Sequence, residues 1–349
     1  MPSIAGSIGL VLPTFPQDTD ELPSAGTLAA LCRQAEAAGA TALWACDHLF
    51  WHRPAVECFT ALAVAAAATT SCAVGSCVAQ IPLRRPHEVA KQAASLQVLS
   101  GGRMVLGLGI GRHPGEYEAA GVAYRDRGRR LDAAIGELRQ AWNPGPGRYV
   151  QLPAPAPVPV WFGGTRAPTL ARTARHGEGW IPLFTPPDEY AAASERLDKE
   201  AERCGRPPAT ITRAAVVFVA VSARRGRAAA AQAVERGMRW TASLFGAPAT
   251  AFARHVVGGD AARCAAELCR WRDAGAEHLA LFVTADNPLV QFEELAGELA
   301  ARTVGSTSPG DISSPSSLPA VTQAPATRSD PSRSDRAAAS RRQRGAEDA

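Results

Sequence analysis

The hydrophobic and polar positions along the chain alternate between two patterns. Short, uninterrupted apolar runs predict strands that are covered on both faces, and longer segments with apolar residues three and four positions apart predict amphipathic helices. The predicted strands cover residues 8–13, 42–46, 72–79, 104–110, 158–162, 179–183, 211–221 and 279–283. The predicted helices cover 25–38, 57–68, 86–99, 129–142, 168–176, 187–204, a region from 224 to 272 broken near Gly246 and Gly258-Gly259, and 289–302.

These segments form eight successive strand-then-helix units. Strands that alternate with helices pair in parallel through right-handed crossovers, and eight units within about 250–300 residues is the number that closes a (β/α)8 TIM barrel. An open, doubly wound sheet is the alternative. After Thr303 the composition changes to Ser, Pro, Ala and Arg with few large apolar residues. We therefore predict an α/β barrel domain over residues 1–302 and a disordered tail over 303–349.

Composition and charge narrow the class of protein. The chain has 349 residues, of which 46% are hydrophobic, and its net charge of +4 comes largely from the arginine-rich C-terminal end, so no nucleic-acid partner is expected. The eight cysteines show no C-x-x-C pairing, which favours reduced thiols in the cytoplasm over a disulfide framework or a metal site. No apolar run approaches the ~20 residues of a membrane span, and no signal peptide is recognised, so we expect a cytoplasmic protein.

Residues 100–113, with the sequence Ser-Gly-Gly-Arg-Met-Val-Leu-Gly-Leu-Gly-Ile-Gly-Arg-His, form the most distinctive stretch of the chain. A glycine turn leads into a buried strand, after which every second residue is glycine at Gly107, Gly109 and Gly111. Alternate side chains are therefore missing on one face, and a bulky group could lie against the backbone there. A tight bend at a barrel rim is the alternative. Position 112 is not glycine, which disfavours the dinucleotide fingerprint G-x-G-x-x-G.

Polar residues follow the predicted strands at the end where TIM barrels carry their active sites. Asp47, His48 and His52 follow the second strand, and Arg112 and His113 follow the fourth. Histidine titrates near neutrality and can exchange a proton during turnover, and Asp47 could fix the tautomer of a neighbouring histidine or raise its pKa. These histidines are therefore either catalytic or structural.

The turn Gly163-Gly164-Thr165 is a second candidate site. It is followed at once by a predicted helix, and the free backbone N–H groups of such a turn, together with the helix dipole, favour an anion such as a phosphate. A plain strand-to-helix turn is the alternative. The chain has no carboxylate pair on neighbouring strand ends, no H-E-x-x-H and no G-x-S-x-G. Glycosidase, metallohydrolase and serine hydrolase activities are therefore disfavoured.

Several motifs together carry a resemblance to a known family. They are Ala42-Leu-Trp-Ala-Cys-Asp-His48, Leu99-Ser-Gly-Gly-Arg-Met-Val-Leu-Gly-Leu-Gly-Ile-Gly111 and Pro159-Val-Trp-Phe-Gly-Gly164, in this order, with Arg84 and Glu116 between them. From about residue 8 to about residue 300 the chain resembles the bacterial-luciferase-like superfamily. The resemblance implies a TIM barrel that binds either FMN or the deazaflavin F420 at the carboxyl ends of its strands.

The resemblance also implies roles for particular residues. His48, with Asp47 beside it, is the expected proton-transfer residue, and His52 is the second candidate. Arg112 stands where some members carry an acidic residue, which implies an anionic substrate or a cation that stabilises a reduced, negatively charged ring. The expected cofactor-binding residues are Cys77 and Val78, which would form a non-prolyl cis peptide behind the ring, together with Gln80, Gly109, Gly111, Gly163, Gly164 and Thr165.

Three functions are compatible with this sequence. The first is an F420-dependent oxidoreductase that moves a hydride between the deazaflavin C5 and a small organic substrate. The second is an FMN-dependent monooxygenase that uses reduced FMN and O2, and the third is a non-catalytic flavin-binding barrel. Aromatic residues in the predicted loops, among them Phe50, Trp51 and Phe245, favour a partly apolar substrate. Members of the superfamily are commonly dimers, so a homodimer is among the expectations.

Overall fold

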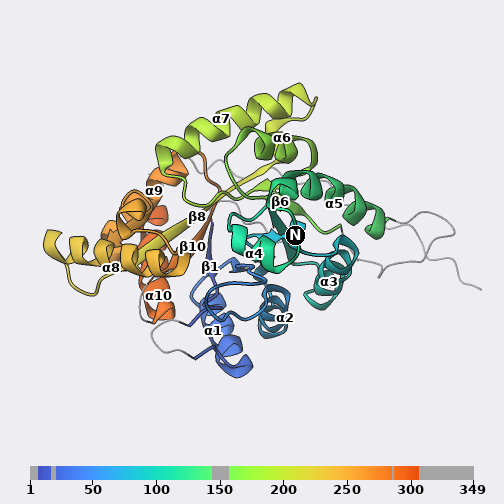
Figure 1. Cartoon of the computed structure of the whole chain (residues 1–349). Helices are drawn as coiled ribbons and strands as arrows, with labels where there is room; N and C mark the ends of the chain where they lie inside the picture. Colours follow the sequence, from blue (N-terminus) through green and yellow to red (C-terminus); the bar gives the residue numbers. More distant parts are fainter. Residues whose placement is uncertain (1–6, 17–20, 144–156, 285–286, 306–349) are drawn as a thin grey trace, which may run out of the picture. The chain divides into compact units, whose positions relative to one another are not determined.

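The computed structural model describes residues 7–16, 21–143, 157–284 and 287–305. Its centre is a barrel of eight parallel strands, with β10 paired to both β1 and β8 so that the sheet closes (Figure 1). The TIM barrel prediction is confirmed, and the open-sheet alternative is wrong. The barrel strands are β1 (Ser7–Val11), β2 (Ala42–Ala45), β3 (Ala73–Ser76), β5 (Met104–Gly109), β6 (Val160–Phe162), β7 (Gly179–Trp180), β8 (Thr212–Val221) and β10 (His278–Val283).

Helices surround the strands (Figure 1). Their apolar residues recur at helical spacing, as at Leu28, Cys32 and Ala35 of the first helix, and that face is buried. Ser24 caps this helix by accepting a hydrogen bond from the backbone N–H of Thr27. The helices are α1 (Ala25–Ala37), α2 (Cys58–Ala68), α3 (Pro86–Leu99), α4 (Pro114–Ala119), α5 (Arg127–Trp142), α6 (Ala167–His176), α7 (Pro187–Arg203), α8 (Arg227–Phe245), α9 (Ala261–Asp273) and α10 (Pro288–Gly305), with single 3-10 turns at Ile81–Leu83, Tyr124–Asp126, Pro208–Thr210 and Ala249–Phe252.

Two indole rings fill part of the barrel interior. Trp44 of β2 packs against Trp161 of β6 with 5.3 Å between ring centroids, and its Nε1 donates a hydrogen bond to Nε2 of His278, 3.0 Å away. Glycines on the neighbouring strands make room for both rings, because a Cβ at Gly75 would lie 2.5 Å from Trp44 and one at Gly179 would lie 2.4 Å from Trp161. Large side chains thus occupy this part of the barrel interior.

The structure differs from the predicted elements in three main places, one of which is the short helix α4, which no predicted element covers. The predicted third strand is divided into β3 and a short β4 (Ala79–Gln80), with Cys77 and Val78 between them. The region 224–272 is not wholly helical, because β9 (Val256–Gly259) pairs with the end of β8. The predicted break at Gly246 is confirmed, since α8 ends there in a left-handed conformation, but Gly258-Gly259 belong to a strand. Val256 and Val257 are β-branched and favour an extended chain. The alanine-rich sequence around them favours a helix, so the sequence pattern does not predict this strand.

The last described helix extends slightly past the predicted helix end. Helix α10 continues to Gly305, three positions beyond residue 302. The rest of the predicted tail, residues 306–349, lies outside the described residues. Within the described ranges no helix combines the length and the apolar character needed to cross a membrane, and no cluster of three potential metal-ligating side chains occurs.

Candidate functional site

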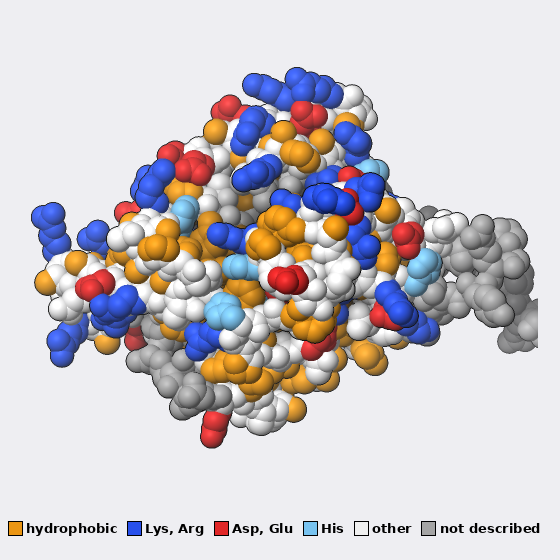
Figure 2. Space-filling model, viewed as in Figure 1, with side chains coloured by type: hydrophobic (Ala, Val, Ile, Leu, Met, Phe, Trp, Pro, Cys, Tyr) orange, Lys and Arg blue, Asp and Glu red, His pale blue; other side chains and the backbone are white. Residues whose placement is uncertain are grey.

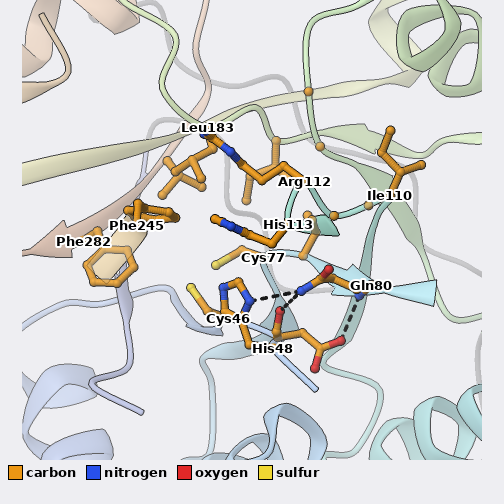
Figure 3. Close-up of a pocket in the computed structure, with 18 residues that line it drawn as sticks. Cys46, His48, Cys77, Gln80, Ile110, Arg112, His113, Leu183, Phe245 and Phe282 are labelled. Atoms are coloured by element: carbon orange, nitrogen blue, oxygen red, sulfur yellow. Dashed lines mark hydrogen bonds between the residues drawn. The ribbon is translucent and has the colours of Figure 1, made fainter. Parts of the chain in front are cut away.

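A cavity of about 210 Å³ opens at the carboxyl ends of the strands (Figure 3). Figure 3 shows His48 and Gln80 on one side of it, Arg112 on the opposite side, and Phe245 and Phe282 on a third. On the face viewed in Figure 2, histidine side chains gather near the middle among hydrophobic ones. The lining residues are Cys46, Asp47, His48, Cys77, Val78, Gln80, Gly109, Ile110, Gly111, Arg112, His113, Gly163, Gly164, Ile181, Leu183, Val216, Phe245 and Phe282.

The segment between β3 and β4 forms a bulge at one wall of the cavity. The Cys77–Val78 peptide bond is cis, as the resemblance implies. The side chain of Val78 lies over the neighbouring strands, since a Cβ at Gly109 would come within 2.3 Å of Val78 Cγ2 and one at Gly163 within 3.0 Å of its Cγ1. The bulge is therefore seated on the glycines of β5 and of the loop after β6.

The alternate glycines of β5 serve a different purpose from the expected one. From the sequence, their missing side chains predict room for a bulky cofactor. In the structure the chain itself occupies this space: Val78 fills the position above Gly109, and Oε1 of Gln80 lies 2.0 Å from where a Cβ at Gly111 would stand. Gly111 also has a φ of 65°, a conformation that other residues rarely adopt. Gly109 and Gly111 still line the cavity, but through their backbone.

His48 is held by a carboxylate from another element. Its Nδ1 lies 3.1 Å from Oε2 of Glu116, a residue of the short helix α4 that begins at Pro114. The Glu116 side chain is 2% exposed and that of His48 is 14% exposed. Burial by itself would raise the pKa of Glu116, but hydrogen bonds from His48, Gln80 and the backbone N–H of Phe50 outweigh it and hold the pKa below its ordinary value. Glu116 is therefore a carboxylate at neutral pH.

This charge assigns the tautomer of His48. An ionised carboxylate only accepts hydrogen bonds. Nδ1 of His48 therefore carries a proton and donates a hydrogen bond to Glu116. The two amide hydrogens of Gln80 are then directed to the backbone oxygen of Asp47, 2.7 Å away, and to Oε2 of Glu116, 3.2 Å away. Trp51 stacks on the imidazole with 3.7 Å between ring centroids. Nε2 is left as the ring nitrogen that can meet a substrate.

Asp47 has a different partner from the one expected. It is buried, and Arg84 binds its carboxylate with two nitrogens, Nε at 3.0 Å and Nη2 at 2.5 Å. The backbone N–H of Gln80 donates a third hydrogen bond at 2.8 Å. Asp47 therefore joins the ends of β2 and β4, and the carboxylate that orients His48 is Glu116 instead. A buried carboxylate and a half-buried guanidinium with matched geometry are a structural pair.

The remaining predicted catalytic residues lie in different surroundings. His52 is exposed, and its ring lies 3.3 Å from the backbone oxygen of Ser243 in α8, away from the cavity lining. Arg112 lines the cavity, and no described side chain forms an ion pair with it. His113 also lines the cavity; burial and the nearby His48 and Arg112 lower its pKa. The structure therefore brings His48, Arg112 and His113 together and leaves His52 outside.

The predicted phosphate turn lies partly at the cavity. Gly163 and Gly164 line it, and Thr165 follows just before α6 begins at Ala167. Gly164 has a φ of 105°, and its backbone oxygen accepts a hydrogen bond from Nε1 of Trp180 at 2.8 Å. The indole thus holds the turn in place. The backbone N–H of Gly163 donates to the oxygen of Leu108 at 3.1 Å, so the part of the turn that could meet an anion is Gly164, Thr165 and the amino end of α6.

The cavity suits a flat group with polar edges. Oε1 of Gln80 and Nε2 of His113 are buried and have no hydrogen-bond partner among the described residues. Buried polar atoms of this kind are costly unless a partner satisfies them, and a polar group bound in the cavity would do so. The wall formed by Val78, Ile181 and Leu183 is apolar and would cover a ring face. FMN and F420 both combine an apolar ring system with polar edges.

The family is decided by a match over most of the chain. Residues 7–278 match the family model described as luciferase-like monooxygenase. The chain belongs to the luciferase-like monooxygenase family. A Mycobacterium tuberculosis protein of uncharacterised function is 34% identical to it over 166 residues, which are 44% of this chain and 57% of that protein.

A second relative has a described activity. The phthiodiolone/phenolphthiodiolone dimycocerosates ketoreductase of Mycobacterium tuberculosis is 30% identical over 201 residues, which are 53% of this chain and 51% of that protein. The chain thus spans about half the length of the curated relatives it matches.

Solved structures with a similar fold include an F420-dependent enzyme and a monooxygenase. An F420-dependent secondary alcohol dehydrogenase, in complex with an F420-acetone adduct, matches with a TM-score of 0.72 and 17% identity, covering 85% of this chain and 99% of that one. A monooxygenase from Streptomyces bottropensis matches with a TM-score of 0.71 and 18% identity, with the same coverage. At these identities the likeness establishes the fold alone, and the cofactor of this luciferase-like chain is not decided by it.

Sequence reasoning gave no role to three residues that the site depends on. In the sequence, Glu116 and Arg84 stand out only as parts of the motifs that carry the family resemblance, and Trp51 only as an aromatic residue in a predicted loop. A local signal exists for Glu116, because Pro114 at the first position of a helix predicts that the acidic residue two positions later lies in its first turn. Its contact with His48, which is 68 positions away, has no local signal.

Proposed function

We propose that this chain is an F420-dependent oxidoreductase that exchanges a hydride with a small carbonyl or alcohol substrate. The observation that carries the proposal is the imidazole of His48, which lines the cavity at the carboxyl ends of the strands and is oriented by the buried carboxylate of Glu116. A solved structure with a similar fold, the F420-dependent secondary alcohol dehydrogenase, supports this choice of cofactor and substrate class. The name of one relative, a ketoreductase, agrees with carbonyl reduction as the reaction class.

When bound, F420 supplies a hydride donor or acceptor, which no side chain can provide. The groups that would hold it are the bulge residues Cys77 and Val78 against the ring, the polar edge at Gln80, and the turn Gly163-Gly164-Thr165 at the phosphate. The chain's own residues then supply the proton, the orientation and the apolar surroundings.

His48 is the group that moves the proton. Reduction of a carbonyl adds a hydride to carbon and a proton to oxygen, and Nε2 of His48 can supply that proton. Glu116 accepts the Nδ1 hydrogen bond and stabilises the ring while it is positively charged. In the reverse direction, neutral His48 takes the proton of an alcohol, and the same carboxylate stabilises the imidazolium that forms.

Apolar side chains face this proton donor across the cavity. Phe245, Phe282 and Leu183 come from α8, β10 and the segment after β7. They keep water away from the reacting atoms and favour a substrate with an apolar body. Arg112, on the side opposite His48 (Figure 3), can meet a negative or polar end of that substrate or the cofactor.

The second candidate function is an FMN-dependent monooxygenase. It is supported by the family description and by the likeness to the Streptomyces bottropensis monooxygenase. The same His48–Glu116 pair would then act as an acid or base toward oxygenated products. A non-catalytic flavin-binding barrel has less support, because it leaves the oriented, cavity-facing imidazole without a role.

A titration with each cofactor separates these functions. The purified protein is titrated with F420 and, separately, with FMN, and binding is followed by fluorescence. Tighter binding of F420, together with turnover of a ketone or secondary alcohol without O2, supports the proposal. Tighter binding of FMN and O2 consumption with reduced FMN supports the monooxygenase. A folded protein that binds neither would contradict both.

The role of His48 has its own test. His48→Ala removes the proton donor but leaves the bulge and the phosphate turn, so turnover falls by about 10²–10⁴-fold while F420 still binds. His87→Ala serves as the control, because His87 is an exposed histidine of α3 that pairs with Glu137 on the surface. Full turnover in His48→Ala would remove this residue from the mechanism.

A further inference from the structure

Two free cysteines lie side by side in the cavity wall. Cys46 follows β2 and Cys77 follows β3, and these parallel strands pair in register up to Ala45 and Ser76. The backbone N–H of Cys77 still donates to the oxygen of Ala45 at 2.9 Å, so the ladder continues to the cysteines. Both residues line the cavity, and Figure 3 shows their sulfur atoms close together.

The geometry is suitable for a bond between them. Neighbouring strands lie about 4.7–4.9 Å apart, which is within the Cα separation of about 4.4–6.8 Å that disulfides span. At the same register position of parallel strands the two side chains point to the same face. The two thiols influence each other, since Cys46, together with burial, raises the pKa of Cys77.

We propose that Cys46 and Cys77 form a peroxide-sensitive dithiol that closes to a disulfide within the cavity. Cys46 is the partly exposed member, and Cys77 is 8% exposed. Hydrogen peroxide first oxidises the sulfur of Cys46 to a sulfenic acid. One peroxide oxygen stays on the sulfur, and the other leaves as a water molecule. The sulfur of Cys77 then attacks the sulfur of Cys46, so that the S–S bond forms and the S–O bond breaks. The hydroxyl group leaves together with the thiol proton of Cys77 as a second water molecule.

The other described cysteines lack this combination. Cys58 is buried, and its thiol donates to the backbone oxygen of Ala45 at 3.5 Å. Cys204 is exposed at the end of α7. Neither lines the cavity.

The disulfide would change the shape of the site. Cys77 begins the bulge that carries Val78 and Gln80, and Cys46 stands two positions before His48. A bond between the sulfurs draws the bulge toward β2 and removes both thiols from the wall. We therefore expect oxidation to weaken F420 binding by about tenfold or more, and this consequence, unlike the disulfide itself, rests on the proposed function.

Peptide mapping of the full-length protein tests the disulfide directly. The reduced protein is treated with a small excess of hydrogen peroxide, its remaining thiols are blocked with iodoacetamide, and it is digested without reductant. We expect a linked peptide pair containing Cys46 and Cys77 that separates on treatment with dithiothreitol. Recovery of both residues in alkylated form, of Cys46 as the sulfinic acid, or of a link from Cys46 to Cys58 would overturn the proposal.

Variants distinguish the order of the steps. In Cys77→Ser the sulfenic acid of Cys46 has no neighbouring thiol to attack it, so dimedone labels Cys46 after peroxide treatment. Labelling of Cys77 in Cys46→Ser to the same extent would contradict the assigned order. Cys204→Ser is the control and forms the same linked peptide as the unaltered chain. F420 titration before and after oxidation is read separately, so a protein that never binds F420 overturns the proposed function and leaves the mapped disulfide as an independent result.

Discussion

At the scale of single residues, two buried carboxylates in the same cavity region have different tasks. Asp47 is held by the guanidinium of Arg84, and Glu116 accepts from the imidazole of His48. An Arg partner is charged at all accessible pH values, whereas His changes its charge near neutrality. The first pair therefore stabilises the strand ends, and the second can take part in proton transfer.

The Glu116 carboxylate is expected to stabilise the folded protein in a pH-dependent way. Its pKa in the folded state is below the ordinary value of 4.5, so its contribution is fully present above pH 4.5 and is lost as the pH falls through the folded-state pKa. Glu116→Gln should lose about 1–3 kcal/mol of unfolding free energy at pH 7, and its deficit should shrink below pH 4.5. Urea unfolding at pH 7 and at pH 3.5 measures both.

The exposed neighbour Glu118, on the same helix, provides the control. Glu118→Gln should change the unfolding free energy by about 0.5 kcal/mol or less at either pH. A deficit of Glu116→Gln that stays the same at both pH values would show that the carboxylate charge is not what stabilises the site.

Asp47→Asn tests the structural role of that residue. It leaves the Arg84 guanidinium, which is 10% exposed, with only the more exposed Glu57 carboxylate as its counter-charge, and we expect a loss of about 1–3 kcal/mol in unfolding free energy. Asp132→Asn breaks the more exposed pair with Arg172 and should cost about 1 kcal/mol or less. Guanidinium unfolding compares the two variants, and equal losses would argue against a buried structural pair at Asp47.

At the scale of elements, the cavity depends on how the bulge after β3 packs against β5. Gly109 at the end of β5 and Gly111 just after it make room for Val78 and Gln80. The glycine motif that predicts space for a cofactor is thus the place where another segment of the chain packs. The surface that lines the cavity is therefore the bulge itself, one layer farther from the strand.

Gly109→Ala tests this packing. The new methyl group would stand 2.3 Å from Cγ2 of Val78, so we expect a loss of about 1–3 kcal/mol in unfolding free energy. Adding Val78→Ala removes the clash, and the double variant should recover part of the loss beyond the sum of the single changes. Thermal and urea unfolding of the unaltered chain, the two single variants and the double variant measure the unfolding free energies that this comparison needs.

Gly136→Ala on the exposed face of α5 is the matched control. No atom lies within 4 Å of the new Cβ, and alanine favours the helix, so this variant should gain about 1 kcal/mol or less. If Gly109→Ala behaved in the same way, the bulge would not be seated on β5 as described.

At the scale of the whole molecule, barrel closure brings residues from distant parts of the chain to one cavity. His48 follows β2, Glu116 lies after β5, and Phe282 belongs to β10, which closes the barrel against β1 and β8. Because the site draws on so many strands, a ligand bound in it should stabilise the barrel as a unit.

Ligand-linked stability should therefore distinguish the two cofactors. A ligand that binds only the folded state adds about 2.7 kcal/mol to the unfolding free energy when present at 100 times its Kd. We expect F420 to raise Tm by several degrees and FMN at the same concentration to raise it less. Calorimetry measures both shifts. A larger shift with FMN would favour the monooxygenase function.

The sequence by itself determined the barrel, because each strand and helix has its own hydrophobic period and the eight units repeat in order. It also placed His48, Arg112 and the glycine turns at strand ends, since each follows an apolar run directly. Only the tertiary structure decided which groups touch. That Glu116 rather than Asp47 orients His48, and that Val78 occupies the space above Gly109, depends on contacts between strands and loops far apart in the chain, and no local pattern encodes such contacts.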